Sequence, residues 1–202
     1  MHLFGTLDSP YVRRTAISLE LLGVPFELEP MSVFSTFEAF SRINPVVKAP
    51  TLVLDDHTVL MDSTLIIEYF ETLSRPADKL LPQQPQPLAW ALRTVGLALA
   101  ACEKAVQIVY EHKLRPPEKL YQPWLERVTR QLLAACEELD RQWTGQPLPH
   151  SRPDQAALTS AVAWSFLQLM VPDVVKAEAF PALKTLGTTL EESAAFKRYP
   201  IA

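Results

Sequence analysis

The 202-residue chain has only two cysteines and four histidines, which restricts the kinds of site that it can build. Cys102 and Cys136 do not form a Cys-x-x-Cys pair, and both lie in helical patterns. We therefore expect two reduced core thiols in place of a disulfide or a metal clip. No two histidines lie three or four positions apart on a predicted helix, so no metal site is predicted.

The chain also lacks basic clusters and long apolar runs. Its net charge is −4 with scattered lysines and arginines, so we expect neither nucleic acid nor an anionic membrane surface as a partner. The longest apolar stretch, residues 156–170, is interrupted by polar residues and is shorter than the ~20 residues that span a bilayer. The first residues lack the charged and apolar regions of a signal peptide. These absences favour a cytoplasmic protein.

What is present is the composition of a folded protein, with 48% hydrophobic and 21% charged residues. Residues 1–75 mix strand and helix patterns, which predicts a sheet with packed helices. The expected strands cover residues 2–5, 26–29, 51–54 and 58–61, and the expected helices cover 11–22, an irregular part of 34–43, and 63–73. The first domain is therefore predicted to be α/β.

A proline-rich segment, residues 76–87, follows and is predicted to be a linker without regular structure. Beyond it every periodic segment is helical, so residues 88–202 are predicted to form an all-α C-terminal domain. The expected helices cover residues 88–114, 119–143, 151–170, 174–186 and 189–196.

The first segment with chemical potential is Ser-Pro-Tyr-Val-Arg at residues 9–13, where a strand leads into a helix. Serine is a preferred N-cap and proline a preferred first helical residue, so capping alone explains Ser9 and Pro10. The same geometry gathers backbone N–H groups at the positive end of a helix dipole, which can hold an anion such as a thiolate. Both interpretations remain open on this segment alone.

The second segment is Asn-Pro-Val-Val-Lys-Ala-Pro-Thr-Leu at residues 44–52. A proline before a strand is ordinary at a sheet edge. If the Ala49–Pro50 bond is cis, however, Ala49 turns its N–H and C=O outward, where an extended peptide can pair with them. Lys48 would then lie beside this edge as a cation for a carboxylate.

The third segment is Met-Asp-Ser-Thr at residues 61–64, which begins a helix and is also explained by capping. A carboxylate, a hydroxyl and exposed N–H groups at one helix N-terminus can equally recognise an α-amino acid. Asp62 would bind the amine, and Ser63 with the backbone would bind the carboxylate.

Together the three segments, in this order and spacing and followed by a proline-rich linker, resemble the cytosolic glutathione transferases, and most of all the bacterial serine-type members. The resemblance implies a thioredoxin-like N-terminal domain, an all-helical C-terminal domain, a homodimer and glutathione as co-substrate. Ser151 to Asp154 is similar to the N-capping box of the family, whose role is in folding. Val46-Val47 departs from the pattern, because many members have glycine before the lysine.

The resemblance also implies roles for individual residues. Ser9 would donate a hydrogen bond to the glutathione sulfur. Lys48 would bind the glycine carboxylate, Ala49 would pair with the cysteinyl backbone, Pro50 would be the cis residue, and Asp62 with Ser63 would hold the γ-glutamyl end.

A second-substrate pocket for a small hydrophobic electrophile is expected between the Ser9 loop and the helical domain. Its candidate lining residues are Tyr11, Tyr110, Lys113 and Trp164. For Tyr110 and Trp164 packing in the core is an equal alternative, and Lys113 near a helix C-terminus suits a partner of the helix dipole.

Three functions compete at this point. The first is a glutathione transferase that activates the glutathione thiol for attack on the electrophile. The second is a non-catalytic ligand-binding or protein-interaction module on the same fold. The third, a glutathione-dependent redox enzyme, is disfavoured because position 9 is serine, and a hydroxyl cannot form a mixed disulfide.

Overall fold

The computed structural model of the chain describes residues 1–149 and 152–201. It divides into two compact units. The first comprises Met1–Gln83 together with the chain from Ser193 onward, and the second comprises Gln84–Glu192. Among the described residues no helix is long and apolar enough to cross a membrane.

A four-stranded sheet forms the centre of the first unit, with the strand order β2-β1-β3-β4. The strands are β1 (His2–Phe4), β2 (Glu27–Glu29), β3 (Thr51–Val53) and β4 (Val59–Met61). β1 and β2 are parallel, whereas the β1–β3 and β3–β4 pairs are antiparallel. The predicted thioredoxin-like α/β domain is thereby confirmed.

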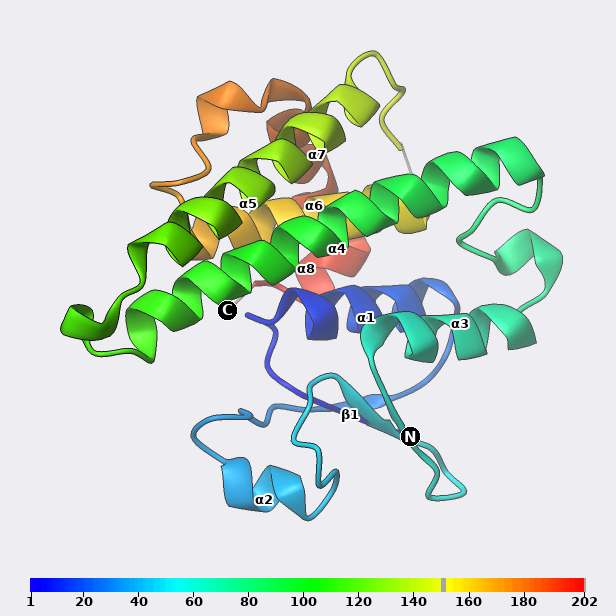
Figure 1. The fold of residues 1–202 in the computed structure, drawn as a ribbon. Helices are drawn as coiled ribbons and strands as arrows, with labels where there is room; N and C mark the ends of the chain where they lie inside the picture. Colours follow the sequence, from blue (N-terminus) through cyan, green and yellow to red (C-terminus); the bar gives the residue numbers. More distant parts are fainter. Residues whose placement is uncertain (150–151, 202) are drawn as a thin grey trace. The chain divides into compact units, whose positions relative to one another are not determined.

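Three helices cover this sheet: α1 (Pro10–Leu21), α2 (Phe37–Ser41) and α3 (Ser63–Leu73). Figure 1 shows α1 and α3 on one side of β1 and α2 on the other. The core is formed by alternate strand residues and by the inner faces of the helices, with Leu3, Ile17, Leu52 and Ile66 fully buried. This packing fixes the N-terminal ends of α1 and α3 relative to the sheet.

The chain from Ser193 onward, which includes α8 (Ala194–Arg198), packs on α1 within the first unit. The fully buried Arg13 connects them: its Nε donates to the carbonyl oxygen of Tyr199 at 2.8 Å, and its guanidinium lies 5.2 Å from the ring centre of Phe196. Glu20 on the same helix accepts hydrogen bonds from Arg198 and from the Tyr199 hydroxyl. The sequence pattern grouped these residues with the helical part, because no local pattern reports a contact over this separation.

Every regular element that the structure describes in the second unit is a helix, which confirms the predicted fold class. It contains α4 (Pro85–Lys113), α5 (Gln122–Trp143), α6 (Gln155–Met170) and α7 (Pro181–Glu191). α6 contacts both α4 and α7 and is buried over most of its length, as expected for the most apolar segment. The indole N–H of Trp143 on α5 donates to Ser160 on α6 at 2.9 Å. Cys102 and Cys136 are both buried and form no disulfide with each other, as predicted.

Several helices differ from the expected ones: α5 begins at Gln122, α6 at Gln155 and α7 at Pro181, each later in the chain than predicted. α4 begins at Pro85, inside the segment predicted to lack regular structure, because the first turn of a helix needs no N–H donor from proline. A short 3₁₀ helix also forms at Pro76–Asp78. The predicted break near residue 187 is wrong, because α7 runs through Gly187, where a Cβ would lie 2.3 Å from Trp164 Cδ1. Glycine is therefore needed there for close helix packing.

The predicted capping box before α6 is described only in part. Ser151 lies outside the described residues. Asp154 is the N-cap of α6, and its Oδ1 accepts from the backbone N–H of Ala157 at 2.8 Å. Burial raises the pKa of this carboxyl, against the lowering effect of the hydrogen bond from Ala157.

Candidate functional site

The strand register brings the three predicted segments to one end of the sheet. Phe4 at the end of β1 lies opposite Thr51 at the start of β3, and Thr51 lies opposite Met61 at the end of β4. The residues that follow β1, precede β3 and follow β4 therefore meet at the same edge. These are the segments that contain Ser9, Ala49 and Asp62.

Ser9 is the N-cap of α1, and Pro10 is the first helical residue. The Ser9 oxygen accepts from the backbone N–H of Val12 at 3.4 Å, which is a long hydrogen bond. In the described chain no group accepts the hydroxyl hydrogen of this half-buried serine. The hydroxyl therefore keeps a donor for an anion at the N-terminus of α1.

The buried side chain of Asn44, which is 4% exposed, supports the loop that carries Lys48 and Ala49. Asn44 Nδ2 donates to Thr51 Oγ1 at 2.9 Å, and its Oδ1 accepts from the backbone N–H of Val46 at 3.0 Å. Thr51 Oγ1 in turn donates to the Lys48 carbonyl at 2.6 Å. Asn44 and Thr51 both lie inside the predicted motif at residues 44–52, but no local pattern indicates that they support the loop.

The Ala49–Pro50 peptide bond is cis, as predicted. In the described chain the N–H and C=O of Ala49 make no backbone hydrogen bond. They remain open to an extended ligand backbone. Val47 has φ 51°, in the left-handed region that glycine adopts most easily. Valine at position 47, where many members of the family that the chain resembles have glycine, thus occupies a backbone conformation that favours glycine.

Two opposite charges flank the site. Lys48 Nζ lies 4.0 Å from Asp62 Oδ2, and the two side chains are 54% and 44% exposed. Asp62 also caps α3, because its Oδ1 accepts from the backbone N–H of Thr64 at 2.9 Å. The same residue has φ 74°, which asparagine and aspartate tolerate better than most residues. Asp62 therefore caps α3 with one carboxylate oxygen, and its other oxygen lies on the side of Lys48.

Ser63 begins α3 and is 3% exposed. Its Oγ accepts from Arg14 Nη1 at 3.0 Å, and the same nitrogen donates to Thr64 Oγ1 at 3.1 Å. Arg14 lies on α1 and is 2% exposed. Arg14 was not predicted as a site residue, because its position on the apolar face of a predicted helix gives no sign of a partner so far along the chain.

The four candidates for a second-substrate pocket come from both units. Tyr11 is half-buried on α1 in the first unit. In the second unit, Tyr110 is 43% exposed and Lys113 is exposed at the last turn of α4. Burial raises the pKa of the Tyr110 hydroxyl. Trp164 is 6% exposed and packs against Phe180 and Gly187, so the structure gives it the alternative role of a core residue.

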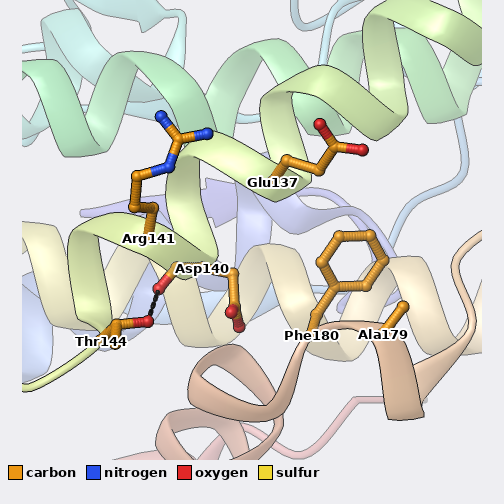
Figure 2. Close-up of a pocket in the computed structure, with 6 residues that line it drawn as sticks. All are labelled: Glu137, Asp140, Arg141, Thr144, Ala179 and Phe180. Carbon is orange, nitrogen blue, oxygen red and sulfur yellow. Dashed lines mark hydrogen bonds between the residues drawn. The ribbon is translucent and has the colours of Figure 1, made fainter.

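Figure 2 shows a hollow of about 250 Å³ in the second unit, between α5 and the start of α7. It is lined by Glu137, Asp140, Arg141, Thr144, Ala179 and Phe180. Asp140 uses its Oδ1 to accept from the backbone N–H of Leu183, which caps α7. The lining contains none of the predicted site residues. The carboxylate of Asp140 has a structural role, because it accepts this hydrogen bond at the start of α7.

A second feature outside the site is an exposed group on β1 and β2. His2, Glu27 and Glu29 bring one ligand atom each to within 4.8 Å of one another. His2 Nδ1 lies 3.5 Å from Glu27 and 3.3 Å from Glu29. These side chains lie on adjacent parallel strands, and their contacts are explained by ion pairing with the histidine when it is protonated.

The three segments lie in a part of the chain that matches a known family model. Residues 3–78 match the family model described as glutathione S-transferase, N-terminal domain. Residues 3–78, which lie within the first unit, are therefore similar to a glutathione S-transferase N-terminal domain.

The curated relatives of the chain include a glutathione S-transferase and an isomerase. Glutathione S-transferase U4 of Arabidopsis thaliana is 29% identical over 117 residues, which cover 52% of this chain and 52% of the plant protein. The match thus spans about half the length of that relative. Maleylacetoacetate isomerase of Mus musculus is 27% identical over 183 residues, which cover 88% of this chain and 78% of the mouse protein.

A solved structure resembles the chain over its full length. It is a glutathione S-transferase from Methylobacterium radiotolerans in complex with glutathione sulfonate. The TM-score is 0.89 at 26% sequence identity, and the alignment covers 100% of this chain and 95% of the other.

Proposed function

We propose that the chain is a glutathione transferase that binds glutathione in its first unit and activates the thiol as a thiolate. The observation that supports this most is the meeting of Ser9, Ala49 and Asp62 at one end of the sheet, set by the register of Phe4, Thr51 and Met61. The glutathione derivative bound to the solved relative supports the same ligand class.

Each part of glutathione has a matching group at this edge. The open N–H and C=O of Ala49 would pair with the cysteinyl backbone. Lys48 would bind the glycine carboxylate, and Asp62 would accept from the γ-glutamyl amine. Ser63 and the N-terminus of α3 would hold the γ-glutamyl carboxylate. Pro50 shapes the loop through its cis bond.

Ser9 would act on the sulfur without attacking anything itself. Its hydroxyl keeps a hydrogen to donate, and the N-terminus of α1 adds a positive potential. A donor to the charged form lowers the pKa of a thiol. A serine at this place is the reason to propose a serine-type member. The resulting thiolate would attack a small hydrophobic electrophile, with Tyr11 on α1 as a candidate contact in the first unit.

A second candidate is a glutathione-dependent isomerase. It is favoured by the mouse relative, whose match covers more of this chain than the match to the plant transferase does. The same thiolate would serve both reactions, so the site geometry does not separate them. Assays with glutathione and a panel of aryl halides, hydroperoxides, unsaturated carbonyl compounds and maleylacetoacetate would identify the reaction. No turnover of any of them, together with normal glutathione binding, would favour the non-catalytic module.

We further propose a homodimer in the cytoplasm. Leu65, Tyr69 and Leu73 on α3 are 60%, 40% and 65% exposed, and their spacing of four residues places them on one face of the helix. Such a stripe on an exposed helix marks an interaction surface. Light scattering should show twice the 22.7 kDa mass of the chain, and Leu65→Glu with Leu73→Glu should halve the particle mass. A parent protein that is monomeric at micromolar concentration would refute the dimer.

A further inference from the structure

Arg14 is a buried charge directly behind the first residues of α3. It lies on α1 and is 2% exposed, and one nitrogen of its guanidinium reaches two hydroxyls on the other helix. Nη1 lies 3.0 Å from Ser63 Oγ and 3.1 Å from Thr64 Oγ1. This nitrogen carries two hydrogens, so it can supply one to each hydroxyl.

The chemistry of the guanidinium fixes the direction of both hydrogen bonds. Arginine has donors and no acceptor, so Ser63 and Thr64 must accept from it. Each hydroxyl then points its own hydrogen away from Arg14. In the part of the chain that the structure describes, no group accepts the hydrogen of Ser63, although this side chain is 3% exposed. A buried donor without an acceptor is costly, and a ligand atom that accepts would satisfy it.

The environment selects an anion as that ligand. The two hydroxyls stand at the N-terminus of α3, where backbone N–H groups and the helix dipole favour negative charge. The buried guanidinium of Arg14 holds both hydroxyls at this N-terminus.

We propose that Arg14 is a positioning residue that holds the hydroxyls of Ser63 and Thr64 as donors to a ligand carboxylate. Under the proposed function, on which this inference rests, the ligand group is the α-carboxylate of the γ-glutamyl residue of glutathione. Arg14 makes no contact with glutathione itself in this account. It sets the hydrogen-bond polarity of the two residues that do, and it thereby determines selectivity for a carboxylated ligand.

The test combines variants of Arg14 with a change in the ligand. Calorimetry compares the affinity for glutathione with that for 4-aminobutanoyl-cysteinylglycine, which lacks only the α-carboxylate. The parent should prefer glutathione by about tenfold or more, as expected for hydrogen bonds to a charged group. Arg14→Gln should lose most of this preference by weakening glutathione alone, and its affinity for the analogue should stay near that of the parent.

Two further variants keep the test decisive. Arg93→Gln removes an exposed arginine of the second unit that pairs with Glu138, and it should keep the full preference of the parent. Arg14→Lys retains the charge on a shorter side chain with a single nitrogen, and it should reduce the preference about threefold or more. Circular dichroism establishes which variants fold. If Arg14→Gln does not fold, the ligand preference of Arg14→Lys provides the test.

The outcomes separate this inference from the proposed function. If the parent binds neither ligand, the proposed function fails and the inference fails with it. If the parent prefers glutathione but a folded Arg14 variant keeps the full preference, only the role of Arg14 is overturned. Equal weakening of both ligands would also overturn it, because a purely structural role does not distinguish them.

Discussion

Asp62 performs two tasks that a single substitution can separate. One carboxylate oxygen caps α3 by accepting from the Thr64 N–H at 2.9 Å, and the other lies 4.0 Å from Lys48 Nζ, on the side where we place the γ-glutamyl amine. Asp62→Asn keeps a capping oxygen and tolerates the φ of 74°, but it removes the charge. Asp62→Ala removes both.

The two variants should therefore differ in a defined way. Asp62→Asn should change the free energy of unfolding by no more than about 0.5 kcal/mol. It should weaken glutathione binding by about 1.5–3 kcal/mol, or roughly ten- to over a hundredfold, because a charge-assisted hydrogen bond is lost. Asp62→Ala should weaken binding to a similar extent and also lose about 1 kcal/mol of stability with the cap.

Urea unfolding measures the first quantity, and calorimetry with glutathione measures the second. If Asp62→Asn binds glutathione as well as the parent does, the carboxylate has been assigned the wrong partner. If Asp62→Ala is as stable as Asp62→Asn, the capping role is incorrect.

Three other predictions concern separate parts of the molecule. Lys48→Ala should weaken glutathione binding by about tenfold, less so at 1 M salt because this lysine is exposed, and equal affinities would refute its role. Burial raises the pKa of Cys136 to about 12 from 9.0, so its contribution to stability is complete below pH 9 and is lost as the pH rises toward 12. The free energy of unfolding, measured with urea between pH 9 and 12, should fall less steeply with pH in Cys136→Ala than in the parent. Parallel falls in the two proteins would contradict this prediction. Gly187→Ala should cost about 1–3 kcal/mol through its clash with Trp164. Gly96→Ala, at a position on α4 where a Cβ meets nothing within 4 Å, should instead stabilise the protein by about 0.5–1 kcal/mol. A lower melting temperature for Gly96→Ala than for Gly187→Ala would refute the packing of Gly187 on Trp164.

The local parts of the site could be predicted from the sequence because their signals are local. Ser9 and Pro10 are adjacent, and a serine followed by a proline specifies the start of α1 whatever lies around it. The short strands on either side of the turn at residues 55–57 likewise predicted the hairpin of β3 and β4. From these elements the meeting of the three segments follows, because the register of the sheet aligns their ends.

The supporting contacts could not be predicted, because they join residues that are distant along the chain. Arg14 reaches Ser63 on another helix, and Arg13 bonds to the carbonyl of Tyr199 near the end of the chain. Both arginines look like charged interruptions of an apolar helix face until the partner segments are in place. The same limit explains the misplaced break in α7, since glycine at 187 is required by Trp164 and does not end the helix.

The thiol pKa of bound glutathione tests the central proposal most directly. The ultraviolet absorbance of the thiolate, followed against pH with saturating glutathione, should give a pKa about one to two units below the value near 8.5 of a free thiol. Ser9→Ala should bind glutathione nearly as tightly but return this pKa toward the free value and lower kcat about tenfold or more at neutral pH. A bound thiol that titrates near 8.5 in the parent, or an unchanged pKa in Ser9→Ala, would contradict thiolate activation by Ser9.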